Sequence, residues 1–569
     1  MLTPKAHDAD IPALTALRFW AAITVVLAHG AAVLLRTQPE LDAVTPIEAL
    51  PQFGMSLFFV LSGFVIHYNY RFVVTKQGLG GIAAFAWARF ARLYPLFALF
   101  LVVDLLFGEK LWAAFLGNAT DFSEVFRALP YYLALVQSWV YIPFSQDSLT
   151  YVVGGNISLS WSISTEWFFY LSYPLLAILV LKLRGLRPIL ITILGWSLIW
   201  AGLAWWLYGQ IPRINTWAAA HYGDLAAPSL SAVRFGAPPI QDTFFRWLLY
   251  FSPYLRIGEF VLGCLTAQLF LHLRDRRPVE GRERWLGPAL AALAALTVPI
   301  VLLLTYGPAP VPFFVALQYN FGLAPTAAVL IFAATRYGGT VGRVLSSRAI
   351  VALGEATYSM YLLHFVIFEI LARELSLPLP LTASNVAYLT VRFAFAIVVL
   401  LLLSLGLYTA FEVPARRWLR SLWRQSSSAG VARPSHRRWA GAIAVTPLLA
   451  ALLCLASQNT LFPDRSRVDS GIQVMSATYG ASCGAPAGNA TRVLISACNG
   501  LSSCDYNVEV TKLGDPAGGC SKDFTLAYRC VPDTTRLDIA LPAEAGLGSH
   551  VHLDCRGGTD PPLTSLTIA

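Results

Sequence analysis

The sequence predicts an all-α polytopic membrane protein with a small, disulfide-stapled β-rich extracytoplasmic domain at its C-terminal end. Two observations predict the membrane part: 56% of the 569 residues are hydrophobic and only 13% are charged, and the mean hydropathy is +0.59. Soluble globular domains are about 25% charged. A third observation predicts the small domain, because six of the eight cysteines fall in the last hundred residues.

Apolar stretches long enough to cross a bilayer as a helix, about 20 residues, recur along the chain. The first shows no signal-peptide cleavage pattern, so we expect it to be retained. The segment 128–142 is short and aromatic, which fits an interfacial or re-entrant piece better than a full crossing. We expect a ten-helix bundle with spans at 11–35, 51–70, 86–107, 161–181, 188–208, 246–271, 285–305, 312–335, 349–374 and 387–411, and an eleventh span at 439–457.

Lys and Arg gather in the loops between alternate spans, which sets the orientation of the chain. With the N-terminus inside, the basic loops are all cytoplasmic, and an odd number of crossings places the C-terminal end outside. The net charge of +9 therefore reflects topology, and we expect lipid around the spans but no nucleic-acid partner. The cytoplasmic basic loops are 71–92, 182–187, 272–284, 336–348 and 416–438.

The composition divides the chain into four parts. Residues 1–420 form the transmembrane domain, 421–438 a basic cytoplasmic linker, 439–457 the additional helix, and 470–556 the small domain, with short strands between turns. Six cysteines in an outward-facing tail indicate disulfides, and fifteen pairings are open. A zinc site is the competing interpretation, but no two of the six follow a Cys-x-x-Cys spacing, so we expect no metal.

Two ionisable residues lie within the first span. Arg18 and His29 are eleven residues apart, which is about three helical turns, so both side chains share one face roughly 16 Å apart along the axis. Charged groups at membrane depth usually face a bundle cavity and mark function. In the competing interpretation Arg18 reaches lipid phosphates and His29 caps the outer end.

Three other stretches carry polar groups into the spans. Arg89 and Arg92 share a helix face at the cytoplasmic edge, where they suit phosphate binding or merely set topology. Glu166 lies near the start of its span among hydroxyl and aromatic side chains. It could serve as a base or orient a histidine, or it could only complement the helix dipole. Tyr361 and His364 align at helical spacing in an apolar span, where a lone histidine is commonly structural.

In this order the stretches resemble the acyltransferase-3 family of bacterial membrane O-acyltransferases, over about residues 10 to 420. The segments that carry the resemblance are Leu17-Arg18 to His29, Phe58-Phe-Val-Leu-Ser-Gly-Phe64, Arg89-x-x-Arg92, Trp161-Ser-x-Ser-x-Glu166 and Tyr358-Ser-Met-Tyr-Leu-Leu-His364.

The resemblance implies transfer of an acyl group, commonly acetyl, from cytoplasmic acyl-CoA to a hydroxyl of a glycan or lipid-linked saccharide outside. It implies a bacterial inner membrane location, with the tail periplasmic or extracellular. Arg89 and Arg92 would hold the CoA phosphates, and His29 would act as general base or transient acyl carrier. Arg18 and Glu166 would assist it, with Tyr361 and His364 as further supporting residues. Acyl-CoA would be a substrate, with no bound cofactor.

The tail resembles the galactose- and rhamnose-binding lectin domain first known from sea-urchin eggs. The resemblance lies in Ala477-Thr-Tyr-Gly480, Ser503-Cys-Asp-Tyr506, Leu513-Gly-Asp-Pro516 and the segment from Cys520 to Cys530. It implies that Tyr479, Asp515 and Lys522 contact a sugar. A purely structural cystine module is the alternative.

Two other classes of protein compete with the enzyme. A transporter or flippase of a glycan or lipid-linked sugar would also line its path with intramembrane His, Glu and Arg. A membrane-anchored lectin is the third hypothesis, but an anchor needs only one helix.

Overall fold

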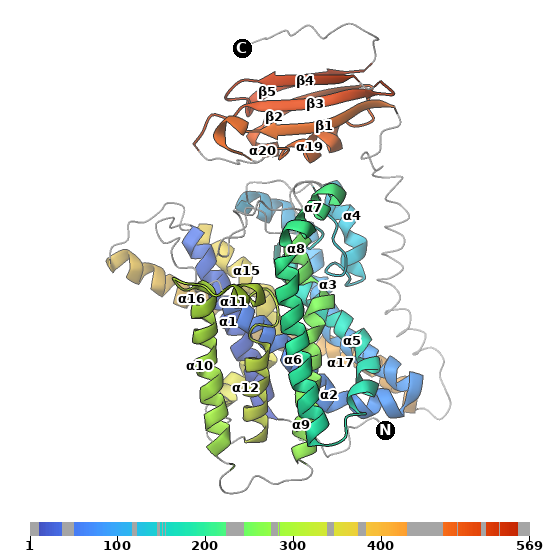
Figure 1. Ribbon diagram of the computed structural model, residues 1–569, viewed down its shortest axis with the longest axis vertical. Helices are drawn as coiled ribbons and strands as arrows, with labels where there is room; N and C mark the ends of the chain where they lie inside the picture. The colour runs from blue at the N-terminus through green and yellow to red at the C-terminus, as the bar shows by residue number, and fades with distance from the viewer. Residues whose placement is uncertain are drawn as a thin grey trace. The chain divides into compact units, whose positions relative to one another are not determined.

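The structure is a computed structural model of the chain (Figure 1). The chain divides into two compact units, a helical unit that ends at Leu452 and a unit that contains the C-terminal β domain, and each is described by itself. The structure describes residues 11–36, 50–116, 122–144, 148–150, 152–153, 155–222, 244–274, 283, 285–337, 346–373, 383–428, 470–485, 487–513, 519–533 and 535–555.

The helical unit is built from long apolar helices joined by short ones, as the hydropathy predicts. The helices in the first half of the chain are α1 (Pro12–Arg36), α2 (Leu50–Lys76), α3 (Gly78–Leu116), α4 (Phe122–Leu133), the 3₁₀ helix η3 (Gly155–Ser160), α5 (Trp161–Val180), α6 (Leu186–Gly209) and α7 (Ile211–Tyr222). Of these, the end of α3 from Glu109 and the start of α4 up to Arg127 are grouped with the second unit. The second half of the helical unit contains α8 (Phe244–Arg246), the π-helix η6 (Trp247–Phe251), α9 (Pro253–Arg274), α10 (Leu286–Tyr306), α11 (Pro312–Leu317), α12 (Ala324–Arg336), α14 (Arg348–Glu355), α15 (Thr357–Arg373), α16 (Ala383–Leu407), the π-helix η8 (Tyr408–Glu412) and α17 (Val413–Ser428).

Within the described residues, seven helical segments are long and apolar enough to cross a membrane. The expected span 349–374 is the pair α14 and α15, which is bent by 75° and gives an eighth crossing if counted as one. The expected span 86–107 lies inside α3, whereas 439–457 lies outside the described residues. The chain is therefore a multi-pass membrane protein.

One expected span is wrong in its details. The stretch 312–335 was expected as a single helix, but the structure divides it into α11 and α12. In the turn between them Phe321 has a positive φ of 69°. Its N–H donates to Glu259 Oε1 of α9 at 3.3 Å, and Asn320 Nδ2 donates to the Leu249 carbonyl at 2.9 Å. These two partners satisfy the Phe321 N–H and the Asn320 Nδ2 group, and they come from a distant part of the chain that apolar periodicity does not reveal.

The centre of the unit is made by α1, α2 and α9, which pack together through residues such as Leu17, Val60, Phe64 and Leu262. Glycines allow the close approach of α2 and α9. A Cβ on Gly63 would lie 1.9 Å from the Phe260 carbonyl oxygen, and one on Gly263 would lie 2.0 Å from that of Val60. Small residues in the middle of a span permit such a close approach of two helices.

The outer helices expose their apolar side chains. Only 11% of the apolar window is buried in α6, in α10 and in the segment Asn385–Trp423, compared with 72% in Phe244–Arg274. Exposed Leu198 in α6, Leu296 in α10 and Phe395 in α16 are examples. Because water disfavours so large an apolar surface, lipid is the expected neighbour of these helices.

The C-terminal domain contains two antiparallel sheets, of order β1-β3-β4 and β2-β5 (Figure 1). Its elements are β1 (Gly471–Tyr479), η9 (Ala481–Cys483), α19 (Thr491–Cys498), β2 (Ser503–Glu509), α20 (Val510–Leu513), β3 (Phe524–Val531), β4 (Arg536–Leu541) and β5 (Leu547–Asp554). In β1, Ile472 and Val474 are buried with Tyr528, which pairs with Val474.

Three disulfides staple this small core, and they join Cys483 to Cys520, Cys498 to Cys504 and Cys530 to Cys555. The expected disulfide-rich β domain is confirmed. All six thiols are used, which removes the thiolate ligands that the zinc interpretation required.

Candidate active site

A pocket inside the helical unit collects residues from α1, α2, α3, α5 and α15. The empty space within it, including the part open to solvent, is about 790 Å³. Apolar side chains such as Phe58 and Ile163 make up part of its wall. Its polar lining is Arg18, Ser62, Arg89, Arg92, Ser162, Glu166, Thr357, Tyr358, Tyr361 and Tyr170.

Three arginines lie in this lining. Arg18 comes from α1, and Arg89 and Arg92 occupy one face of α3, as their spacing predicts. Arg18 interacts electrostatically with both of the others. Arg89 is 4% exposed, and its guanidinium carbon lies 4.6 Å from the centroid of the Tyr70 ring.

Positive charge exceeds negative charge in this pocket. Among the described lining residues Glu166 is the only carboxylate. The Arg89 Nε group is buried without a hydrogen-bond partner in the described part of the chain. A multiply charged anion would offset the repulsion between the arginines and satisfy that donor.

Glu166 lies on α5 and is held by two hydroxyls. Ser62 Oγ donates to Glu166 Oε1 at 3.0 Å, and the Tyr170 hydroxyl donates to the same oxygen from one helical turn away. Glu166 also interacts electrostatically with Arg18 and Arg92. The structure therefore places Glu166 as the counter-charge to the arginines.

The two histidines singled out in the sequence meet. His29 Nδ1 of α1 lies 2.8 Å from His364 Nε2 of α15, with an angle of 12° between the rings. His364 Nδ1 lies 2.7 Å from the Tyr361 carbonyl oxygen. Because a carbonyl only accepts, His364 Nδ1 carries a proton there, and in the neutral pair His29 Nδ1–H donates to His364 Nε2. This arrangement leaves His29 Nε2 as the unprotonated nitrogen.

Tyr361 connects the histidine pair to the pocket. Its side chain lines the pocket, and its hydroxyl donates to the Leu159 carbonyl at 2.7 Å and accepts from Ser162 Oγ at 2.9 Å. His364 follows one turn later on the same helix. The pair therefore lies beside the pocket wall formed by Tyr361 and Ser162.

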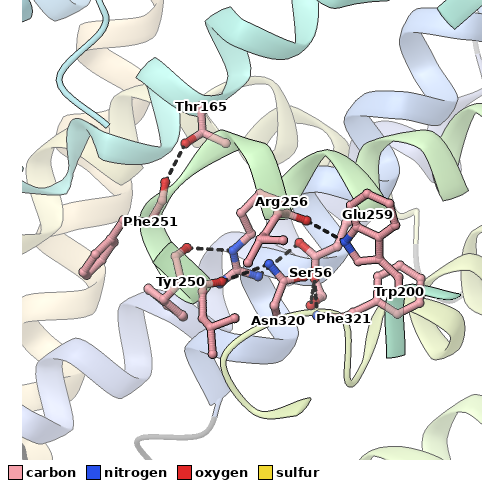
Figure 2. Close-up of polar contacts among 11 residues, drawn as sticks. Ser56, Thr165, Trp200, Tyr250, Phe251, Arg256, Glu259, Asn320 and Phe321 are labelled. Carbon is pink, nitrogen blue, oxygen red and sulfur yellow. Dashed lines mark hydrogen bonds and ion pairs between the residues drawn. The ribbon is translucent and has the colours of Figure 1, made fainter. Parts of the chain in front are cut away.

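A buried ion pair lies next to this region (Figure 2), and the sequence reasoning missed it. Arg256 Nη1 lies 3.1 Å from Glu259 Oε2, and both side chains are almost fully buried in α9. Ser56 Oγ of α2 donates to Glu259 Oε1 at 2.6 Å, and Arg256 Nε donates to the Tyr250 carbonyl at 2.8 Å. Opposite charges three residues apart in an apolar span are the signal that could have revealed it.

The residues expected to contact a sugar lie in the β domain. Tyr479 and Lys522 are 3% and 7% exposed, and Lys522 Nζ donates to the Cys520 carbonyl at 2.9 Å. Both residues adjoin the turn at Ala545–Gly546: the Ala545 N–H donates to the Lys522 carbonyl, and Gly546 leaves room for the Tyr479 hydroxyl. Asp515 lies outside the described residues.

The fold and the site together define a multi-pass membrane protein with an arginine-rich internal pocket and an adjacent histidine pair. A family model described as an acyltransferase domain matches residues 11–409. Since this match spans more than half of the chain, the protein belongs to the acyltransferase-3 family and is an acyltransferase.

The chain is also similar to a curated protein, acyltransferase MdmB of Streptomyces mycarofaciens. The two are 29% identical over 366 residues, which cover 63% of this chain and 79% of the relative. No solved structure matches the chain.

Proposed function

We propose that the protein is a membrane O-acyltransferase that moves an acyl group, in particular acetyl, from cytoplasmic acyl-CoA to a hydroxyl of an extracytoplasmic glycan or lipid-linked saccharide. One observation carries this proposal: an arginine-rich pocket, whose described lining holds Glu166 as its one carboxylate, adjoins a histidine whose tautomer is set by a second histidine. Family membership supports the class of reaction.

The arginines are assigned to the donor. Arg89 and Arg92 bind phosphates of the CoA nucleotide, because a guanidinium presents paired donors to phosphate oxygens. Arg18 adds positive charge from α1, and Glu166 keeps the three arginines in place when the donor is absent. The apolar lining around Phe58 and Ile163 suits the pantetheine arm of the donor.

His29 is assigned to proton transfer. Its Nε2 takes the proton of the acceptor hydroxyl as the oxygen attacks the thioester carbon, so that the C–O bond forms and the C–S bond breaks. The protonated histidine then returns the proton to the departing thiolate of CoA. His364 holds the imidazole in the required tautomer.

The second role open for His29 is that of a transient acyl carrier. In that route the same nitrogen, Nε2, is the nucleophile that attacks the thioester and holds the acyl group covalently. Rapid acid quench with radiolabelled acetyl-CoA and no acceptor tests that route. Label retained on wild-type protein but not on His29→Ala would assign the carrier role, and its absence assigns the base role.

The location follows from the charge pattern. We place the protein in the bacterial inner membrane with the N-terminus cytoplasmic and the C-terminal domain periplasmic or extracellular, since the basic loops would otherwise face outward. There the disulfides of the β domain are stable. We propose that this domain binds carbohydrate and presents the acceptor.

The test is acyl-CoA consumption by the purified full-length protein with a glycan acceptor. Wild-type protein should release CoA, and His29→Ala and Arg89→Ala should lose this activity. His221→Ala is the matched control, since His221 is an exposed histidine whose Nδ1 bonds the Trp217 carbonyl of its own helix. Glycan movement across the membrane without CoA release would instead support a transporter or flippase.

A further inference from the structure

α17 brings a fourth arginine, Arg420, into electrostatic interaction with Arg89 and Arg92 of the pocket lining. This helix follows the residues matched by the family model, which end at 409. From the sequence alone, its basic residues were expected to set the topology. In the structure α17 packs against α3, the helix that carries Arg89 and Arg92. Leu419 is buried among Trp87, Phe90 and Ala91, and the Trp87 indole N–H donates to the Leu419 carbonyl at 3.0 Å.

This docking fixes which arginines of α17 lie on the side that packs against α3. Arg416, Leu419, Arg420 and Trp423 recur at intervals of three and four residues and therefore share one face of the helix. The Trp423 ring lies 6.2 Å from that of Trp87 in the same contact. On the other face Arg417 is exposed to solvent.

Arg420 lies among cations. Its electrostatic neighbours are Tyr70, Arg89, Arg416 and Arg92, and the hydroxyl of Tyr70 accepts a hydrogen bond from Arg89. Arg416 differs, because it also interacts with the carboxylate of Glu412. The strongest electrostatic neighbours of Arg420 in the described part of the chain include no carboxylate.

The Nε groups of Arg89 and Arg420 are both buried without a hydrogen-bond partner among the described residues. Both donors belong to guanidinium groups that interact with Tyr70, and a phosphate group is the kind of acceptor that would satisfy them. The apolar contact of Leu419 holds the second guanidinium there even in the absence of an anion.

We propose that Arg420 is a further donor-binding residue, which together with Arg89 holds a phosphate group of the nucleotide end of acyl-CoA. This inference rests on the proposed function. The same chemistry would also fit the phosphate of a lipid headgroup, and the experiment separates the two sources.

The experiment measures kinetics of the full-length protein in nanodiscs with two donors, acetyl-CoA and acetyl-pantetheine, which lacks all phosphates. Arg420→Ala should raise the KM for acetyl-CoA about ten- to a hundredfold, the range expected for a lost charge-assisted hydrogen bond, with kcat within about twofold. It should leave the KM for acetyl-pantetheine unchanged. Arg420→Lys should restore part of the affinity, and Arg417→Ala is the matched control.

An unchanged KM for acetyl-CoA in Arg420→Ala would overturn the proposal. An equal rise with both donors that depends on the fraction of anionic lipid would assign Arg420 to lipid headgroups instead. Loss of folding is detected by thermal unfolding of each variant. Absence of CoA release by wild-type protein would refute the proposed function itself, and binding of 3′,5′-ADP to wild type and Arg420→Ala then tests the phosphate site alone.

Discussion

His29 Nδ1 and His364 Nε2 lie 2.8 Å apart, and the Tyr361 carbonyl fixes which of the two histidines donates. His29 lies on the first helix of the unit and His364 on α15, 335 residues later. The residue proposed for proton transfer is therefore oriented by a partner that is itself oriented by the backbone.

His364→Ala should lower kcat by about ten- to a hundredfold, the usual cost of losing a residue that orients a functional histidine, with little change in KM for the donor. His364→Gln keeps an acceptor oxygen and should recover part of the rate. The measurement is steady-state CoA release, with His221→Ala as control. An unchanged kcat in His364→Ala would show that His364 does not orient His29 for the reaction.

Glu166 should matter for stability as well as activity. Glu166→Ala removes the counter-charge of Arg18 and Arg92 and leaves the hydroxyls of Ser62 and Tyr170 unpaired. We expect a loss of about 3 kcal/mol in unfolding free energy and about 1 kcal/mol for Ser62→Ala. Thermal unfolding in detergent measures both. Equal losses of unfolding free energy in Glu166→Ala and Ser62→Ala would contradict the role of the Glu166 carboxylate as counter-charge to the arginines.

Gly63→Ala should destabilise the helical unit by more than 2 kcal/mol, because the new methyl group would collide with the backbone of α9 at Phe260. Gly195→Ala in α6 is the matched control, since no atom outside its own helix lies within 4 Å of the added Cβ. It should be neutral or slightly stabilising. The comparison uses the unfolding temperatures of the two variants, and similar values would contradict the close packing of α2 and α9.

Breaking the ion pair between Arg256 and Glu259 from one side should cost about 3 to 5 kcal/mol, since it leaves a buried charge without its partner. The double variant Arg256→Met with Glu259→Leu should be less damaging than either single variant. A double-mutant cycle of unfolding free energies measures this coupling. Additive losses would mean that the two groups do not stabilise each other.

Asp523 gives the β domain a pH dependence. Its Oδ1 accepts hydrogen bonds from the Ser482 N–H and Oγ, both at 2.8 Å, and these bonds lower the pKa of the carboxyl below its usual range. Their stabilisation is complete above the unfolded pKa of about 4 and is lost as pH falls through the lower folded pKa.

Hydrogen exchange of the Ser482 amide, corrected for its intrinsic rate, should therefore show protection that decreases only below about pH 4. In Asp523→Asn this pH dependence should disappear. Protection with the same pH dependence in Asp523→Asn as in wild-type protein would contradict the assignment.

Much of the fold was predictable because membrane insertion imposes strict rules on composition. Helices such as α1, α2 and α10 coincide with the apolar stretches, since only a helix satisfies its backbone groups within a bilayer. The six tail cysteines likewise predicted disulfides, because a small domain outside the cytoplasm needs them. The break between α11 and α12 was missed, since one of the groups that bond its turn is Glu259, which is more than sixty positions earlier in the chain.

By itself the sequence singled out the candidate residues: Arg18, His29, Arg89, Arg92 and Glu166 stand out because polar groups are costly within apolar spans. Only the tertiary structure decided their partners. Helical spacing places residues on a face, but not against another helix. The packing of α15 on α1 and of α17 on α3 pairs His29 with His364 and brings Arg420 to Arg89.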